Sequence, residues 1–517
     1  MNEKAPERIH GNAAEALELS CLVAQLSEMA GLYGKACERI TQLEEQIRQL
    51  HRRLFGASSE RYVPNQILLD ELLKQGESQA PAAPEPVVEV KATQRRKASP
   101  HGRTEIPDHL EREDILLDIP EEQKIDADGN PMIKLREEIS EKLAWRAGCW
   151  YVKRFIRPVY VSSNRQSDMG VVCAPMPDSP IDKCKADNSV LSLVAVQKWD
   201  DHLPTYRQRG IFQRQGIHIP ASTLDGWAIE SILKCDLLAD AIKTKVLSSP
   251  VIHTDDSPVD LQVPGRGKTK EARLWVYLSG IGPPLRFFDF TTDRCKERPG
   301  SILKEYKGFV QADAYSGYDH LFEARADIVE VGCWAHVRRK FDEAKNSAPM
   351  QSCEMLGHIR LLYDIERRIS EDKPEVRLAV RQAEAVPLLE SFFKRVCEML
   401  PGSLPSQPLG KALTYAIRQK DALMRYATDG RLSIDNNPAE NAIRPLAIGR
   451  KNWLFVGSER GGKACAIAMS LIHSAKALGI NCQEYLTDVY SRIMSHPVNR
   501  LHELLPDEWK AAREKQG

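Results

Sequence analysis

The sequence predicts an α/β core that is interrupted by an all-helical block and preceded by a long amphipathic helix, a small β-containing domain and a helical hairpin. Three observations favour this fold class. Short apolar runs separated by glycine and proline follow one another from about residue 250 to 332, as in a series of strands. Helix-forming residues dominate from about 344 to 428. Apolar residues recur at helical spacing near the N-terminus, and 517 residues suffice for about three or more domains.

The N-terminal segment has the most regular pattern. Apolar or aromatic side chains recur from Leu19 to Leu54 in alternating steps of three and four. With Leu19 at heptad position a, isoleucine falls at later a positions and leucine at d positions, which favours a parallel two-stranded coil. We therefore expect residues 1–73 to form a dimerising coiled coil. The alternative is an amphipathic helix packed on its own domain.

Two less regular segments follow. Residues 74–104 are rich in proline, alanine, serine and charge, a composition that buries little and predicts a flexible linker. Residues 105–187 are expected to form a small domain, because the segment WYVKRFIRPVYV has the composition of a strand.

Residues 188–245 are expected to be helical and to resemble a helix-turn-helix. One helix would end near Gly216, Pro220 would lie in the turn, and Ser222 or Thr223 would cap a second helix. Such a unit can place its second helix in a DNA groove. Helical hairpins that do not read DNA are more common, so both interpretations stay open.

Five strands are expected within residues 246–475. The runs SPVIHTD, ARLWVYLSG and PLRFFDFTTDR predict three consecutive strands. A helix around Pro299–Tyr306 leads to a fourth strand ending at Asp313, and IVEVGCW predicts a fifth. Three meandering strands followed by strand, helix and strand are the order of an RNase H-like domain. In that fold the first and fourth strands bring Asp255 and Asp313 to one edge of the sheet.

A helical insertion is expected at about 344–428, after which the core resumes. Asn436 or Asn437 can cap the next helix, and Pro438 suits its first turn. Glu440 lies in that turn, one turn before Arg444. Residues 476–517 are expected to form a C-terminal helical tail.

Three acidic side chains, Asp255, Asp313 and Glu440, would converge in this arrangement. Singly, each is more often a solvated or capping residue. Together they would repel one another unless divalent cations lay between them, and Mg²⁺ prefers such oxygen ligands. A metal pair can clamp the attacking and leaving oxygens of a phosphodiester. Asp256 cannot share this role, because neighbouring strand residues face opposite sides.

Composition excludes little. Lys+Arg and Asp+Glu both number 72, so any nucleic-acid surface must concentrate its positive charge locally. No apolar run approaches the roughly 20 residues of a membrane span. The 12 cysteines are irregularly spaced, with no Cys-x-x-Cys pair, and we expect reduced thiols in an intracellular protein.

A rival motif lies at Gly457–Ala464, after the apparent strand NWLFV. It approaches the phosphate-binding pattern GxxxxGK[ST], but Ala464 cannot supply the hydroxyl that ligates Mg²⁺. Too little chain follows for a nucleotide-binding sheet. Its glycines and Arg460 are better suited to close approach to DNA phosphates, or to a tight turn.

These motifs together resemble the large TnpC-type transposases of the insertion sequence sixty-six family. The matching segments cover most of the chain and include RRLFGASSER, QGIHIPASTLDGW, HTDDSPV, QADAYSGY, CWAHVRRKF and DNNPAENAIRPLAIGRKNWLFVGSERGG. By this resemblance Asp255, Asp313 and Glu440 are expected to be the catalytic, metal-binding triad. The family pattern places the first acid at Asp255 rather than Asp256.

The resemblance implies a DDE-type transposase that cleaves DNA and transfers strands of an insertion sequence by metal-dependent phosphoryl transfer. Mg²⁺ is the expected cofactor, and Mn²⁺ can replace it. His336 could line the same groove as the residues expected to contact DNA phosphates, which are Arg338, Arg339, Arg444, Arg450, Lys451 and Arg460. For the helix carrying His336, a solvated basic face is the alternative.

The expected partners are transposon ends, target DNA, a second copy of the chain through the coil, and accessory transposition proteins, with no membrane. A cytoplasmic bacterial protein that joins the nucleoid when DNA-bound is implied. Two other functions stay open: an RNase H-like nuclease without strand transfer, and a non-catalytic DNA-binding regulator.

One departure from the family concerns zinc. Its members commonly carry two Cys-x-x-Cys pairs in the small domain, whereas this chain has KIDADGN and YVSSNRQSD at those places. Cys149, Cys173 and Cys184 lack the spacing of a tetrahedral site, so we expect the domain to fold without zinc.

Overall fold

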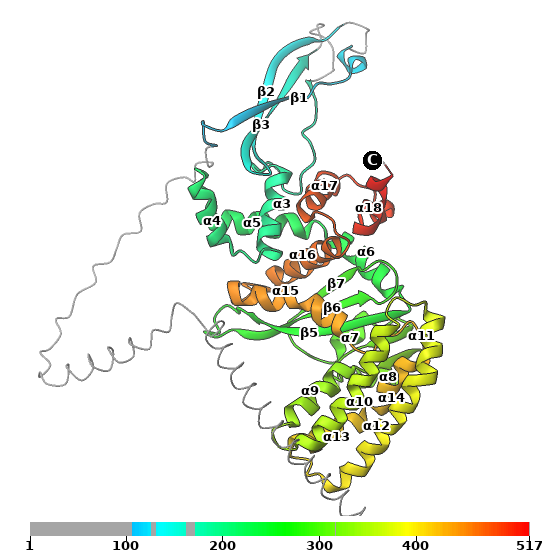
Figure 1. Cartoon of the computed structure of the whole chain (residues 1–517). Helices are drawn as coiled ribbons and strands as arrows, with labels where there is room; N and C mark the ends of the chain where they lie inside the picture. The colour runs from blue at the N-terminus through cyan, green and yellow to red at the C-terminus, as the bar shows by residue number, and fades with distance from the viewer. Residues whose placement is uncertain (1–105, 126–130, 162–170, 316, 516–517) are drawn as a thin grey trace, which may run out of the picture. The chain divides into compact units, whose positions relative to one another are not determined.

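The computed structural model describes residues 106–125, 131–161, 171–315 and 317–515 (Figure 1). The coiled coil predicted for 1–73 and the linker predicted for 74–104 lie outside these residues and stay predictions. Within them, two sheets and many helices confirm a mixed α/β fold.

A small sheet of four strands lies within residues 105–187, where a small domain was predicted. Its strands are β1 (Glu111–Leu116), β2 (Ile133–Arg146), β3 (Cys149–Val161) and β4 (Val172–Cys173). β2 and β3 form a long antiparallel hairpin whose two-residue loop contains Gly148 at φ +79°, a left-handed conformation that glycine adopts without strain. β1 pairs parallel to β3. The strand predicted at WYVKRFIRPVYV is therefore confirmed.

Four helices follow, and they join the small sheet to the core. They are α3 (Asn188–Trp199), α4 (Thr205–Arg214), α5 (Ala221–Leu233) and α6 (Asp236–Leu247). Trp150 of β3 packs edge-on against Phe212 of α4, with ring centroids 4.9 Å apart. In α5, the four-residue steps at Leu224, Ala228 and Ile232 face the core and are fully buried.

The predicted cap of α5 is wrong. The helix begins directly after Pro220, so Ser222 and Thr223 lie inside its first turn and neither caps it. Proline fixes its own φ and can start a helix without a side-chain cap. α5 contains no lysine or arginine, whereas Asp225 and Glu230 both pair with basic residues. Its exposed side is therefore unlike a helix that enters a DNA groove.

All five strands predicted for the core lie in one mixed sheet of order β7-β6-β5-β8-β9. They are β5 (Val251–Leu261), β6 (Lys270–Ser279), β7 (Arg286–Thr291), β8 (Gly308–Gln311) and β9 (Ile328–Val331). β5, β6 and β7 pair antiparallel, whereas β8 lies parallel to both β5 and β9. The connecting helices are α7 (Glu297–Ile302), shorter than the predicted Pro299–Tyr306, and α8 (Asp319–Ala324).

Helix α16 (Glu459–Ala477) covers the edge strand β7. The hydroxyls of Ser470 and Ser474 accept hydrogen bonds from the backbone N–H groups of Phe288 and Arg286, at 2.8 and 2.9 Å. These bonds satisfy backbone groups that an uncovered edge would leave open to another strand.

The same helix explains the glycine-rich motif. The side chain of Ser458 caps α16 by accepting from the N–H of Gly461, and a Cβ on Gly462 would lie 2.5 Å from the ring of Phe290. Gly462 is thus required for close packing of α16 on β7. The apparent strand NWLFV is also wrong: Trp453 ends a helix, and only Val456 forms an isolated bridge, to Leu261.

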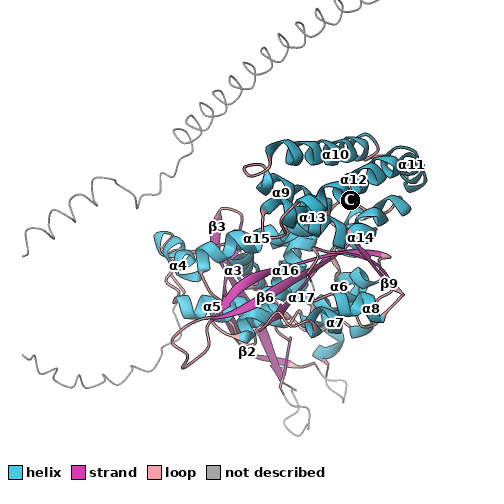
Figure 2. Cartoon of the chain, turned by 90° about the horizontal axis from the view of Figure 1, so that it is seen from below, coloured by secondary structure: helices cyan, strands magenta, loops and turns pink. Residues whose placement is uncertain are grey.

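Residues 345–436, which include the predicted insertion, are mostly helical, and their buried side chains form a separate core beside the sheet (Figure 2). Their helices are α10 (Pro349–Arg368), α11 (Pro374–Val380), α12 (Val386–Met399), α13 (Pro408–Arg418) and α14 (Lys420–Arg425). α9 (Trp334–Ala344), which follows β9, contributes Trp334 and Phe341 to that core. The insertion returns to the sheet where the N–H of Gly332 donates to the carbonyl of Ala422, at 2.9 Å.

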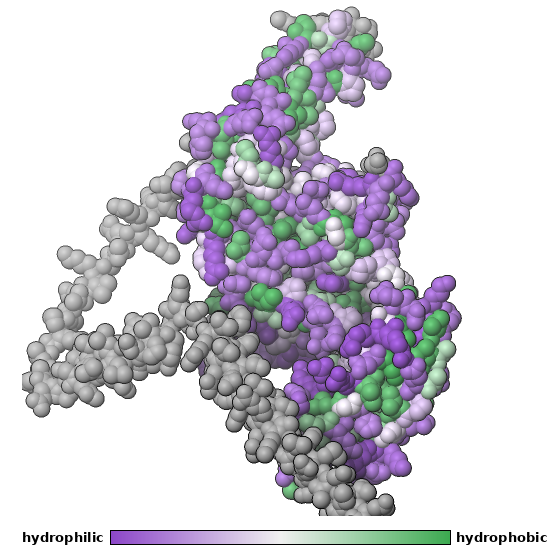
Figure 3. Space-filling model, viewed as in Figure 1, coloured by the Kyte–Doolittle hydropathy of each residue, from purple (hydrophilic) through white to green (hydrophobic). Residues whose placement is uncertain are grey.

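The C-terminal helices are α15 (Asn437–Trp453), α16, α17 (Cys482–Arg492) and α18 (Pro506–Glu514). α17 packs on α3, and Tyr485 and Tyr490 of α17 are fully buried. The predicted tail at 476–517 is therefore part of the core. Among the described residues, no helix combines the length and apolarity needed to cross a membrane. Hydrophilic side chains cover most of the face in Figure 3, and apolar ones gather over parts of the insertion.

Candidate active site

Strand register brings two of the predicted acids together. In the parallel pair, His253 of β5 is opposite Gln311 of β8, and it is the last pair of that ladder. Asp255 and Asp313 each lie two residues further along. Side chains two residues apart on a strand share a face, so both carboxylates leave the same end of the ladder. On its other edge, β5 pairs antiparallel with β6 beyond Asp255, so this pairing holds the backbone of Asp255 in place.

The third acid is held near them by one buried side chain. Asn436 precedes α15, and its Nδ2 donates to the carbonyl of Thr254 at 2.8 Å, while its Oδ1 accepts from Nδ1 of His253 at 3.1 Å. Its backbone N–H donates to the sulfur of Cys333 at 3.2 Å. Asn436 thus ties the start of α15 to β5 and to the end of β9. This placement sets Glu440, in the first turn of α15, beside the strands that carry the aspartates.

The position predicted for the helix cap is therefore right, but its chemistry differs. Asn436 occupies the N-cap position without a side-chain capping bond. Asp435 accepts instead from the N–H of Asn437 at 3.1 Å and from the hydroxyl of Tyr363 on α10 at 2.7 Å. The insertion thereby also holds the segment that carries Glu440.

Asp256 has a separate role. Its carboxylate is only 2% exposed and forms ion pairs with Arg273 at 3.0 Å and with Arg294 at 2.8 Å. It faces the side of β5 opposite His253 and Asp255, as strand alternation requires. Its negative charge is therefore compensated by two guanidinium groups, whereas no lysine or arginine of the described residues forms an ion pair with Asp255.

The acids interact electrostatically. Burial, followed by the negative charge of Asp313, raises the pKa of Asp255 from 3.8 to about 7, and Glu440 adds to this effect. Burial also raises the pKa of Asp313, which Asp256 and Glu440 raise further, while His336 and Arg294 oppose the change. Ionised carboxylates are costly here unless a cation compensates them. Such mutual perturbation is common at functional sites.

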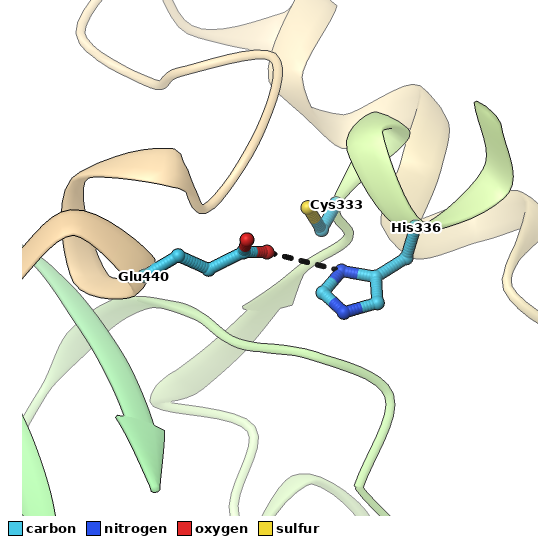
Figure 4. A group of neighbouring side chains, drawn as sticks. All are labelled: Cys333, His336 and Glu440. Atoms are coloured by element: carbon cyan, nitrogen blue, oxygen red, sulfur yellow. Dashed lines mark ion pairs between the residues drawn. The ribbon is translucent and has the colours of Figure 1, made fainter. Parts of the chain in front are cut away.

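His336, which was predicted only as a residue that could line the groove, lies next to Glu440. Nδ1 of His336, in the first turn of α9, is 3.7 Å from Oε1 of Glu440 (Figure 4). Within the described part of the chain, Cys333, His336 and Glu440 are the one grouping of three possible ligands whose atoms all lie within 4.8 Å of one another. The sequence signal for His336 was only its position two residues before Arg338.

The predicted DNA-binding residues fall into two groups. Arg338, Arg339 and Glu440 line a cleft of about 340 Å³ together with Ala335, Asp342, Tyr363 and Asn437. Arg444 and Lys451 are exposed along α15. These four basic side chains are placed where a phosphate backbone could reach them.

The other two predicted basic residues are engaged within the protein. Arg450 donates to the hydroxyl of Ser257 at 3.0 Å and to the carbonyl of Pro258 at 2.7 Å. This pair of bonds fastens the last turn of α15 to β5. Arg460 pairs with Glu230 of α5. A DNA phosphate would have to displace these partners.

The described residues include ten cysteines with free thiols, of which four are buried and three exposed. Cys149 donates to the carbonyl of Trp150, and Cys184 accepts from the N–H of Ala186. The prediction that the small domain folds without zinc stays a prediction.

Comparison with known proteins identifies the family. The family model described as "Transposase IS66 family" matches residues 183–464, more than half of the chain. "Transposase C of IS166 homeodomain" matches residues 42–115, and "IS66 C-terminal element" matches 470–506. The chain therefore belongs to the IS66 transposase family, as its motifs indicated.

Full-length relatives occur in Sinorhizobium fredii (strain NBRC 101917 / NGR234). Uncharacterized protein y4hP is 30% identical over 505 residues, covering 92% of this chain and 89% of the relative. Uncharacterized protein y4qI is 29% identical over 522 residues, covering 96% and 94% respectively. Similarity thus extends along nearly the whole chain, including the segments that carry all three acids.

Proposed function

We propose that the chain is a DDE-type DNA transposase that cleaves DNA strands and transfers the resulting ends to target DNA. The observation that carries the proposal is the electrostatic interaction of three acids from separate elements: Asp313 and Glu440 both raise the pKa of Asp255, and Glu440 also raises that of Asp313. The strand order and the placement of these acids favour an RNase H-like core with an inserted helical domain.

The residues fit a divalent metal cofactor. Asp255 is largely buried and has a raised pKa, without a cationic side chain to neutralise it. Hard cations such as Mg²⁺ or Mn²⁺ bind carboxylate oxygens of this kind, and Asp255, Asp313 and Glu440 would hold them. When bound, such cations stabilise the charge that develops in phosphoryl transfer.

The chain's own residues would position the DNA. Arg338 and Arg339 line the cleft that opens onto Glu440, so they would hold the phosphate backbone beside the acids. Arg444 and Lys451 would extend this contact along α15. Arg450 has a structural role in the proposal, because its hydrogen bonds keep α15 on β5.

Cleavage and strand transfer on DNA that carries the element's terminal repeats test the proposal. With Mg²⁺ or Mn²⁺, the wild-type chain should cut and join, whereas Asp313→Asn and Glu440→Gln should lose both steps and still bind DNA. Asp289→Asn is the matched control, because Asp289 is also a buried aspartate with a raised pKa but lies on β7 among Lys243 and Arg298.

Each other outcome names a different function. Cleavage without joining would indicate a nuclease. DNA binding without chemistry in the wild-type chain would indicate a regulator. Full strand transfer by Glu440→Gln would contradict the assignment of the third acid.

A further inference from the structure

His336 is placed as a member of the acidic site. It lies in the first turn of α9, and its ring points toward Glu440 (Figure 4). Its side chain is 18% exposed, and its Nδ1 is buried without a hydrogen-bond partner among the described residues. Burying a polar nitrogen without a partner is costly. The Nδ1 lone pair of His336 is therefore free for a partner other than the described residues, and the acids beside it decide which partner fits.

The distance from His336 to Glu440 indicates what that partner is. At 3.7 Å, the Nδ1–Oε1 separation is too long for a hydrogen bond. Two ligands of one cation, each about 2.1 Å from it, lie roughly 3.0 Å apart at a right angle and roughly 4.2 Å apart when opposite. The observed separation falls between these limits, so one ion can contact both atoms without moving either side chain far.

The charges around the ring support the same partner. Glu440 and Asp313 are the acids that interact with His336, and Arg339 and Lys340 are the neighbouring cations. Mg²⁺ and Mn²⁺ prefer carboxylate donors, so the two acids beside the ring suit the same ion.

Cys333 does not complete this group as a ligand. Its sulfur already accepts the backbone N–H of Asn436 at 3.2 Å. Thiolate ligands suit softer metals, whereas carboxylate oxygens suit Mg²⁺ and Mn²⁺. Cys333 therefore anchors the start of α15, which leaves His336 and Glu440 as the pair that faces a shared ion.

We propose that His336 is a nitrogen ligand, together with Glu440, of a divalent cation at the acidic site. This inference rests on the proposed function, because it assigns a further residue to the same cofactor. Imidazole is a softer donor than carboxylate. The site should therefore favour Mn²⁺ over Mg²⁺ more strongly than a purely carboxylate site would.

Mn²⁺ binding to the full chain without DNA tests this assignment apart from activity. Pulsed electron paramagnetic resonance of the bound Mn²⁺ should show coupling to an imidazole ¹⁴N nucleus. His336→Leu should abolish that coupling and weaken Mn²⁺ binding at least about tenfold. His336→Gln should also lose the coupling but regain part of the affinity, because its amide oxygen can ligate, and it serves if the leucine variant folds poorly.

His358→Leu is the matched control. His358 is a half-buried histidine on α10 whose Nδ1 also has no partner among the described residues, but it packs on Phe392 in the insertion core. It should bind Mn²⁺ like the wild type. Cys333→Ser should retain the ¹⁴N coupling.

The outcomes separate this inference from the proposed function. If Asp313→Asn abolishes Mn²⁺ binding but His336→Leu retains the coupling and the affinity, His336 is not a ligand and the acidic site stands. If the wild-type chain binds no Mn²⁺, or if Asp313→Asn leaves binding unchanged, both the ligand assignment and the proposed metal site are wrong.

Discussion

Replacing Asp255 with asparagine should stabilise the metal-free protein while it abolishes catalysis. Burial and the neighbouring acids raise the pKa of Asp255 from 3.8 to about 7, so its ionised form is disfavoured in the folded chain. Asparagine is nearly isosteric and neutral at every pH. It also retains an oxygen that can accept the N–H of Asp256, as the Asp255 Oδ1 does at 2.8 Å.

The magnitude follows from the pKa difference. At about 1.4 kcal/mol per pKa unit, ionised Asp255 costs at most about 4 kcal/mol of unfolding free energy above pH 7. Solvent at the partly open site reduces this value, so we expect a gain of about 2 kcal/mol for Asp255→Asn. That gain corresponds to a rise in Tm of about 2–3 °C for a chain of this length.

The pH dependence has a definite sign. Because the folded-state pKa lies above the unfolded value, the protonated group contributes stability below about pH 4, and this contribution is lost as the pH rises through about 7. The advantage of Asp255→Asn over the wild type should therefore be largest at pH 8, shrink toward pH 5 and vanish near pH 4.

Thermal unfolding in the presence of a chelator, from pH 4 to pH 8, measures this difference. Added Mn²⁺ should raise the Tm of the wild type and have little effect on Asp255→Asn, because ligand binding stabilises only a state that has the site. Asp289→Asn should gain stability, since burial raises the pKa of Asp289 to about 6. It should keep the response to Mn²⁺, because Asp289 lies on β7 and is not one of the three acids of the site. An Asp255→Asn variant that is no more stable than the wild type at pH 8 would refute the reasoning.

Three further changes test the framework of the site. Asn436→Ala should lower the unfolding free energy by about 1–3 kcal/mol in urea titrations, because it leaves the buried carbonyl of Thr254 without its hydrogen bond. It should also slow cleavage more than about tenfold, because Glu440 is then held less firmly. Unchanged cleavage would contradict the positioning role of Asn436. Asp256→Asn should cost about 3 kcal/mol in the same titrations, since it leaves two arginines without their buried partner; near wild-type stability would count against that role. Lys451→Ala should reduce the slope of log K against log salt for DNA binding by roughly 0.9, because one phosphate contact is lost. Arg450→Ala should lower the Tm and leave that slope unchanged, because Arg450 bonds within the protein. The reverse pattern would mean that Arg450 contacts DNA and Lys451 is structural.

Much of the core was predictable because its signals are local. Each strand of the large sheet is a short apolar run between turn residues, so β5 to β9 were expected at the places where they occur. Alternation along a strand also predicts that Asp255 and Asp256 face opposite sides of the sheet. The order of these elements then placed two acids at one edge of the sheet.

Other features depended on contacts between distant residues. The segment NWLFV has the composition of a strand, but α15 extends through Trp453 and leaves only Val456 to pair. The glycines after it resemble a phosphate loop, whereas Gly462 lets α16 pack closely against the ring of Phe290, because it has no Cβ. Arg450 was expected at DNA because it is basic, yet its partners are 192 and 193 residues away in the sequence.

The sequence by itself indicated most of the elements, the family and the three candidate acids, because periodicity, turn chemistry and motifs are properties of neighbouring residues. Only the tertiary structure decided how those acids are held and what surrounds them. Asn436 binds β5 across 182 residues, and His336 reaches Glu440 across the whole insertion. No local pattern encodes such distances. They are set by the register of the sheet and by the packing of the helices around it.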